Sequence, residues 1–200
     1  MKQIKLGFLN TSEQELKDLI RAWLAISLAF AIVMAGFSLS FNFYYTFIIS
    51  ALTVGLGFII HEMGHKAVAQ HYGCFAEFRA FNTMLWLAIL MSFFGFVFAA
   101  PGAVMISGPV GRRRNGKISM AGPLANLIIA AVFFAAIFFG FKNALTAYGF
   151  IINTWLGLFN MLPFGNFDGR KILNWNRIVY ISMIVAGFVF MFLHGYLGGL

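Results

Sequence analysis

The stretch "GFIIHEMGHKAVAQHYG", residues 57–73, places His61, Glu62 and His65 directly after a long apolar segment. Residues 22–60, which precede these three side chains, contain no charged residue. An ionisable group at the edge of such a segment is costly to keep there, and it indicates a functional site by default. Two questions follow from the position of these three side chains. The first is whether the chain folds in a membrane, and the second is what function the three polar groups have.

The composition indicates a membrane protein. The chain has 200 residues, of which 61% are hydrophobic and only 10% are charged, whereas soluble domains carry about 25% charged residues. So little polar surface cannot cover a water-exposed fold, which excludes a soluble protein. At this length we expect one domain, residues 1–200. The net charge of +8 does not indicate a nucleic-acid partner, because the basic residues lie at loop ends.

Uncharged runs locate the expected membrane spans. A spanning helix needs about 20 apolar residues, and the first run is long enough for two helices joined by a turn near residues 40–42. The sequence predicts a mainly α, polytopic membrane protein with about five transmembrane helices. Their expected ranges are 22–41, 43–71, 117–140, 145–165 and 178–198.

The N-terminal segment, residues 1–21, is polar and has no cleavage site typical of a signal peptide. Its part "TSEQELKDLIR", residues 11–21, is typical of an amphipathic helix capped by Thr11 or Ser12. Two arrangements remain open. The segment is an interfacial helix that lies on the membrane before the chain enters it at Ala22, or it is an N-terminal extension of the first spanning helix.

Residues 80–111 are expected to enter the membrane and return. Basic residues favour the cytoplasmic side, and all of them except Lys142 lie on that side if the N-terminus is cytoplasmic and this segment does not cross once. The part "AAPGAVMISGPVG", residues 99–111, is rich in Pro and Gly and favours extended structure. We predict a re-entrant element with a short strand or hairpin, and the alternative is a spanning helix with a kinked end.

The motif "HEMGH", residues 61–65, has the H-E-x-x-H pattern of a zinc site. His61 and His65 lie four residues apart, so they share one helix face and can both reach one zinc ion. Glu62 is rotated by about 100° from His61 and can act beside the metal as a base. The alternative is an interfacial cluster of His and Glu that reaches to water.

Asp168, in "FNMLPFGNFDGRKIL", residues 159–173, is the best third ligand. It stands just before Arg170, and His65 stands just before Lys66, so both lie at a similar depth near the cytoplasmic side. Helix breakers surround Asp168 and allow its carboxylate to turn inward. The other histidines fit less well, because His71 faces another side of its helix and His194 lies at the far end of the last span. Cys74 is the only cysteine, which excludes a cysteine-cluster metal site.

With these residues the chain resembles the site-2 protease family of intramembrane zinc metalloproteases. The resemblance covers residues 43–170, the expected catalytic core. It rests on His61-Glu62-Met63-Gly64-His65, on Asn160-Met161-Leu162-Pro163 with Phe167-Asp168-Gly169, and on Ala121-Gly122-Pro123-Leu124-Ala125-Asn126.

The resemblance implies one zinc ion held by His61, His65 and Asp168, with Glu62 activating water. Asn160 is implied near the scissile carbonyl, where it either donates to the oxyanion or makes an interhelical polar contact; Asn126 is open to the same two roles. The implied substrate is a single-span membrane protein in the lipid bilayer. We expect a prokaryotic plasma membrane, and the sequence does not indicate the oligomeric state.

Two rival functions are also open. A zinc or other divalent metal transporter would also place His and Asp inside spans, although Glu62 has no obvious task in transport. A catalytically inactive relative could bind membrane helices as a chaperone, although the intact Glu62 argues against it.

Overall fold

The structure is a computed structural model that describes residues 3–7, 9–97 and 100–196. It is mainly helical, with two small sheets, which confirms the predicted fold class. The helices are α1 (Glu13–Ala35), α2 (Phe41–Ser50), α3 (Leu56–His71), α4 (Asn82–Ser92), α5 (Arg112–Phe138), α6 (Ala144–Asn160), α7 (Asp168–Trp175) and α8 (Arg177–Tyr196), with a π-helical turn, Ala51–Gly55, between α2 and α3. The strands are β1 (Gln3–Leu6), β2 (Leu9–Ser12), β3 (Phe75–Ala80) and β4 (Gly102–Ser107).

Four helical segments in the described part of the chain are long and apolar enough to cross a membrane. They are α1, the continuous segment from α2 through α3, α5 and α8. The fifth expected span, residues 145–165, corresponds to α6, which has 17 residues. These segments agree with the expectation of a polytopic membrane protein.

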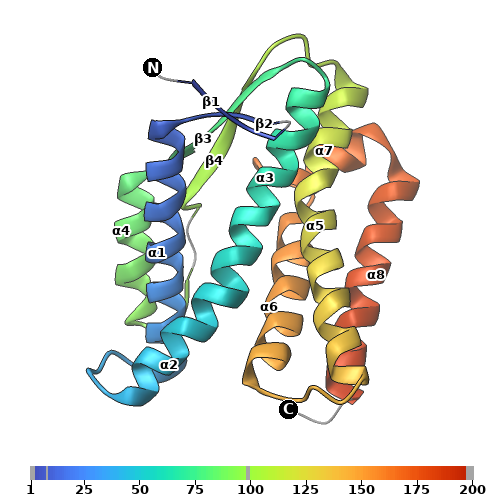
Figure 1. Ribbon diagram of the computed structural model, residues 1–200. Helices are drawn as coiled ribbons and strands as arrows, with labels where there is room; N and C mark the ends of the chain where they lie inside the picture. Colours follow the sequence, from blue (N-terminus) through green and yellow to red (C-terminus); the bar gives the residue numbers. More distant parts are fainter. Residues whose placement is uncertain (1–2, 8, 98–99, 197–200) are drawn as a thin grey trace.

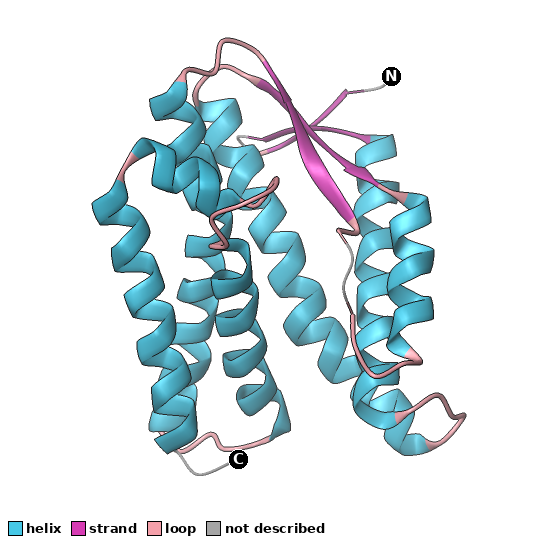
Figure 2. Ribbon diagram, turned by 180° about the vertical axis from the view of Figure 1, so that it is seen from behind, coloured by secondary structure: helices cyan, strands magenta, loops and turns pink. Residues whose placement is uncertain are grey.

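The helices form two groups with α3 between them. Figure 1 shows α1 and α4 on one side, α5, α6 and α8 on the other, and α3 running obliquely between the groups. The strands gather at one end of the bundle, as both views show (Figure 2). Helix α3 packs closely on α5, because a Cβ on Gly64 would lie 2.9 Å from the carbonyl oxygen of Ala121. Small residues permit such close approach between membrane helices.

Helix α1 begins directly after β2 and continues without a break into the apolar segment. The side chain of Ser12 caps it by accepting a hydrogen bond from the backbone N–H of Glu15 at 3.1 Å. This continuity from Glu13 to Ala35 agrees with an N-terminal extension of the first expected span. The hairpin of β1 and β2, which precedes it, was not predicted.

The segment between β3 and β4 leaves the sheet and returns to it. Ala80 and Gly102 are partners in the antiparallel register, so residues 81–101 start and end at the same place. Helix α4, with 11 residues, is about 16 Å long and cannot cross a hydrocarbon core of about 30 Å. The short strand β4 and the return of the chain to the same sheet agree with the predicted re-entrant element. Its partner strand β3 was not foreseen.

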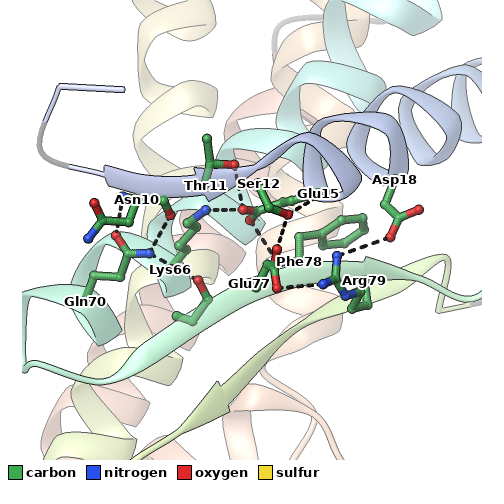
Figure 3. Close-up of polar contacts among 11 residues, drawn as sticks. Asn10, Thr11, Ser12, Glu15, Asp18, Lys66, Gln70, Glu77, Phe78 and Arg79 are labelled. Carbon is green, nitrogen blue, oxygen red and sulfur yellow. Dashed lines mark hydrogen bonds and ion pairs between the residues drawn. The ribbon is translucent and has the colours of Figure 1, made fainter. Parts of the chain in front are cut away.

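A polar cluster joins the N-terminal residues to α3 and β3 (Figure 3). Lys66 forms an ion pair with Glu15, and the backbone N–H of Phe78 donates to the same carboxylate at 2.9 Å. The sequence predicts Lys66 as a charge at a loop end, but its side chain is buried. The N-terminal cluster comprises Asn10, Thr11, Ser12, Glu15, Asp18, Lys66, Gln70, Glu77, Phe78 and Arg79.

Candidate metal centre

His61, His65 and Asp168 converge on one point. Helix α3 carries the two histidines one turn apart, and Asp168 is the first residue of α7. The Nε2 atoms of the two histidines are 3.0 Å apart. The Oδ2 atom of Asp168 lies 3.5 Å from His61 Nε2 and 3.0 Å from His65 Nε2. All three side chains are buried.

These distances fit three ligands of one zinc ion. Zinc binds imidazole nitrogen and carboxylate oxygen at about 2.0–2.2 Å in tetrahedral geometry, which places neighbouring ligand atoms about 3.3 Å apart. The observed separations of 3.0, 3.0 and 3.5 Å bracket that value. The geometry therefore joins the three residues that the sequence predicted as ligands.

The other ring nitrogens are held as they are in metal-ligating histidines. His65 Nδ1 lies 2.8 Å from the carbonyl oxygen of Ile118, and His61 Nδ1 lies 2.6 Å from Asn126 Oδ1. Both oxygens are acceptors, so each neutral ring carries its proton on Nδ1 and a lone pair on Nε2. Two lone pairs and a carboxylate oxygen then face one another, an arrangement that a divalent cation stabilises. Fixing the tautomer from the far side of the ring is typical of metal-ligating histidines.

Gly122 leaves the space that such an ion requires. A Cβ on this residue of α5 would lie 2.4 Å from His65 Nε2 and 2.6 Å from His61 Nε2. Contacts that short are not tolerated, so any larger residue would displace the histidines. Gly122, which the sequence analysis places in the stretch Ala121-Gly122-Pro123, thus forms one wall of the centre.

A helix break delivers Asp168, as the sequence predicted. Helix α6 ends at Asn160 and α7 begins at Asp168. The chain folds back tightly here, because a Cβ on Gly169 would lie 2.1 Å from the carbonyl oxygen of Met161. Lys171 Nζ lies 3.6 Å from Asp168 Oδ1, the oxygen that faces away from the histidines. The two carboxylate oxygens therefore have different partners.

Glu62 is buried and contacts the re-entrant strand. Its Oε2 atom accepts a hydrogen bond from the backbone N–H of Val104 on β4 at 3.0 Å. Val104 is the register partner of Phe78, whose own N–H donates to Glu15 rather than across the sheet. This pair is therefore a non-hydrogen-bonded one, and the N–H of Val104 points away from β3 toward α3. The strand edge thus lies beside the motif.

A cavity of about 410 Å³ opens beside Glu62. His61, Asn126 and Asn160 also line it, and the rest of its lining is mostly apolar, with residues such as Phe30, Phe58 and Trp155. Asn160 donates from Nδ2 to the carbonyl oxygen of Leu156, one turn back on α6, at 2.9 Å. The structure thus brings Asn160 to the same cavity as the motif.

Other residues weighed from the sequence lie apart from the metal centre. His71 is exposed at the end of α3, and His194 on α8 packs against the ring of Phe150 with centroids 6.1 Å apart. Cys74 is buried near the sheet.

Sequence reasoning missed Asn153, whose amide contacts Asn126. Its position as a polar side chain inside the uncharged run 143–167 was the available signal.

Comparisons with known proteins agree with this geometry. No family model matches the chain, and no solved structure matches it. A protein of Methanocaldococcus jannaschii named "Putative zinc metalloprotease" is 42% identical over 182 residues, which cover 88% of this chain and 91% of that protein. Such identity over nearly the whole of both chains shows a shared family, and the name of the relative agrees with the zinc ion that the three ligands fit. The chain therefore belongs to the zinc metalloprotease family of this archaeal protein.

Proposed function

We propose that the chain is an intramembrane protease of the site-2 type, which hydrolyses a peptide bond within or near a transmembrane segment of a membrane-protein substrate. One observation carries the proposal. The two Nε2 atoms and Asp168 Oδ2 converge within a bundle of apolar helices, while Glu62 lines the adjoining cavity. The metalloprotease name of the relative supports the reaction class.

In this proposal His61, His65 and Asp168 hold the zinc ion. Bound zinc supplies a Lewis acid that polarises a carbonyl group and lowers the pKa of water to about 7. All three ligand side chains are buried, so bulk water does not surround them. The attacking water reaches the site through the cavity beside Glu62.

Glu62 acts as the general base and then as the general acid. Because Val104 holds Oε2, Oε1 remains to take a proton from the attacking water. The same carboxylate returns this proton to the amine nitrogen that leaves. The bond to Val104 also ties the position of Glu62 to the strand edge.

Asn160 stabilises the substrate's carbonyl oxygen as negative charge develops on it. One N–H of its amide is donated to Leu156 O, and an amide nitrogen carries two N–H groups. The second one is available to the cavity that Asn160 lines.

The substrate binds as an extended strand along the outer edge of β4. Backbone groups alternate along a strand, so the N–H of Ile106 points away from β3 like that of Val104. Pairing with this edge supplies hydrogen bonds that offset the cost of unwinding the substrate helix. We place the N-terminus in the cytoplasm and the protein in the plasma membrane of a prokaryote, because the basic residues then lie inside.

The metal-transporter alternative is not favoured, since the relative is named a metalloprotease. The intact Glu62 likewise disfavours an inactive chaperone.

The test compares wild type with Glu62→Gln against a library of tagged single-span membrane proteins in proteoliposomes. We expect the substitution to lower cleavage by about 10²–10⁴-fold, while bound zinc stays the same. Glu13→Gln, which alters an exposed carboxylate paired with Lys17 on the first turn of α1, serves as the control. A library that zinc-loaded wild type leaves intact, or equal cleavage by Glu62→Gln, would overturn the proposal.

A further inference from the structure

Asn153 is a fully buried amide on α6, and it lies within an apolar stretch. We propose that Asn153 is a positioning residue for the metal centre, because it orients Asn126 and, through it, the ring of His61. The proposal concerns metal binding, and it stands whether or not the chain cleaves membrane proteins.

The orientation of the Asn153 amide is fixed by its own helix. Its Nδ2 atom donates to the carbonyl oxygen of Gly149 at 2.9 Å. A carbonyl oxygen can only accept, so the nitrogen must occupy this side. The Oδ1 atom of Asn153 is thereby directed at α5, where it accepts from Asn126 Nδ2 at 3.1 Å.

The orientation of Asn126 is fixed by two acceptors, one of which is Asn153. The Nδ2 atom of Asn126 donates both to Asn153 Oδ1 and to the carbonyl oxygen of Gly57, each at 3.1 Å. Two acceptors on this side leave Oδ1 to face His61 Nδ1 at 2.6 Å. His61 must then carry its proton on Nδ1, and its Nε2 lone pair points to His65 and Asp168.

The hydrogen bonds are thus all donated in one direction across three helices, from His61 on α3 to Asn126 on α5 and on to Asn153 and Gly149 on α6. Both asparagine side chains are fully buried, in surroundings where hydrogen bonds are strong and an unmade one is costly. Loss of Asn153 removes one of the two acceptors that hold Asn126 Nδ2. The carbonyl oxygen of Gly57 then remains as the single acceptor on this side, so the amide is held less firmly and the His61 tautomer that ligates metal loses part of its preference. Partners of this kind contribute about 10–100-fold to metal affinity.

The test measures the zinc dissociation constant of the purified full chain in detergent, by competition with a chelator. We expect Asn153→Leu to weaken zinc binding by about 10–100-fold and to change the visible spectrum of the Co²⁺-loaded protein. Asn153→Asp is the conservative variant. Its buried acid in the neutral form can donate to Gly149 O and accept from Asn126, so it should restore most of the affinity.

Thr154→Val is the matched control. Thr154 is the next residue on α6 and is also buried, but its hydroxyl donates to Phe150 O within the same helix. It should bind zinc as wild type does. If Asn153→Leu also binds zinc like Thr154→Val, the proposal is wrong.

A double-mutant cycle keeps the test decisive if Asn153→Leu does not fold. Asn153→Ala removes the amide without introducing a larger apolar group. Since Asn153 acts through Asn126, the double variant Asn126→Ala/Asn153→Ala should bind zinc no more weakly than Asn126→Ala alone. Losses that add in the double variant would show that Asn153 acts independently, which would overturn the relay.

Discussion

Lys66 and Glu15 form an ion pair whose side chains are 1% and 0% exposed, although 51 residues separate them in the chain. Lys66 directly follows the metal-binding His65, and Glu15 lies in the first turn of α1. The same carboxylate accepts hydrogen bonds from Thr11 and from the backbone of Phe78 on β3 (Figure 3). The N-terminal segment therefore holds β3, and with it the strand edge at Glu62, in place beside α3.

Removal of Lys66 should destabilise the fold. In Lys66→Met the Glu15 carboxylate stays buried without its partner, and loss of one member of a buried pair costs about 3–5 kcal/mol. Unfolding in detergent by denaturant titration measures the change. The double variant Glu15→Gln/Lys66→Met should recover much of the stability, because no charge then remains unpaired and the glutamine oxygen can still accept from the N–H of Phe78. Lys17→Met, which removes an exposed partner of Glu13, should leave the midpoint unchanged, and an equal effect of both single substitutions would refute the argument.

Gly122→Ala should impair metal binding. The added methyl group would lie 2.4 Å from His65 Nε2, so one or both histidine rings must move away from Asp168. We expect a loss of zinc affinity of at least about tenfold, the lower end of the range for disturbed ligand orientation. Isothermal titration of the metal-free protein measures it. Gly111→Ala is the control, because nothing lies within 4 Å of a Cβ at Gly111. Unchanged affinity in Gly122→Ala would show that the ligands do not meet in this geometry.

The metal ligands could be predicted from local patterns. His61 and His65 lie four residues apart, so helical periodicity places them on one face. The helix breakers around Asp168 predicted its inward turn. Their supporting partners could not be predicted in the same way. The carbonyl of Ile118 carries no sequence signal, and the contact of Asn153 with Asn126 depends on how α5 and α6 pack.

The strands, like the metal centre, could be predicted only where local sequence determines them. Pro and Gly in residues 99–111 predicted extended structure in the re-entrant element, because they disfavour helix. The partner strand β3 is short and carries Glu77 and Arg79, so its sequence does not predict a strand. Its position depends on long-range contacts with Glu15 and β4. Likewise the ion pair of Lys66 could not be predicted, because its partner Glu15 lies 51 residues away in the sequence.

Metal removal should lower the stability of the wild-type fold. Without a cation, three acceptor atoms face one another at 3.0–3.5 Å, and a ligand at 100 times its dissociation constant stabilises the native state by about 2.7 kcal/mol. Thermal unfolding with and without EDTA measures the shift. His65→Ala, which lacks one ligand, should show a much smaller shift. Equal melting temperatures of wild type in both conditions would contradict a metal held at this site.

Ile106→Pro should slow cleavage without affecting zinc content. Its N–H points away from β3, so proline removes an edge donor and leaves the ladder between β3 and β4 intact. Val104 is less suitable, because its N–H already holds Glu62 and its replacement would disturb the base as well. The rate of cleavage of a single-span substrate in proteoliposomes measures the effect. Ile106→Ala, which shortens the side chain but keeps the N–H, should cleave close to the wild-type rate. If both variants cleave equally, the substrate does not pair with the edge of β4, and its unwound segment must be held by the side chains of the cavity instead.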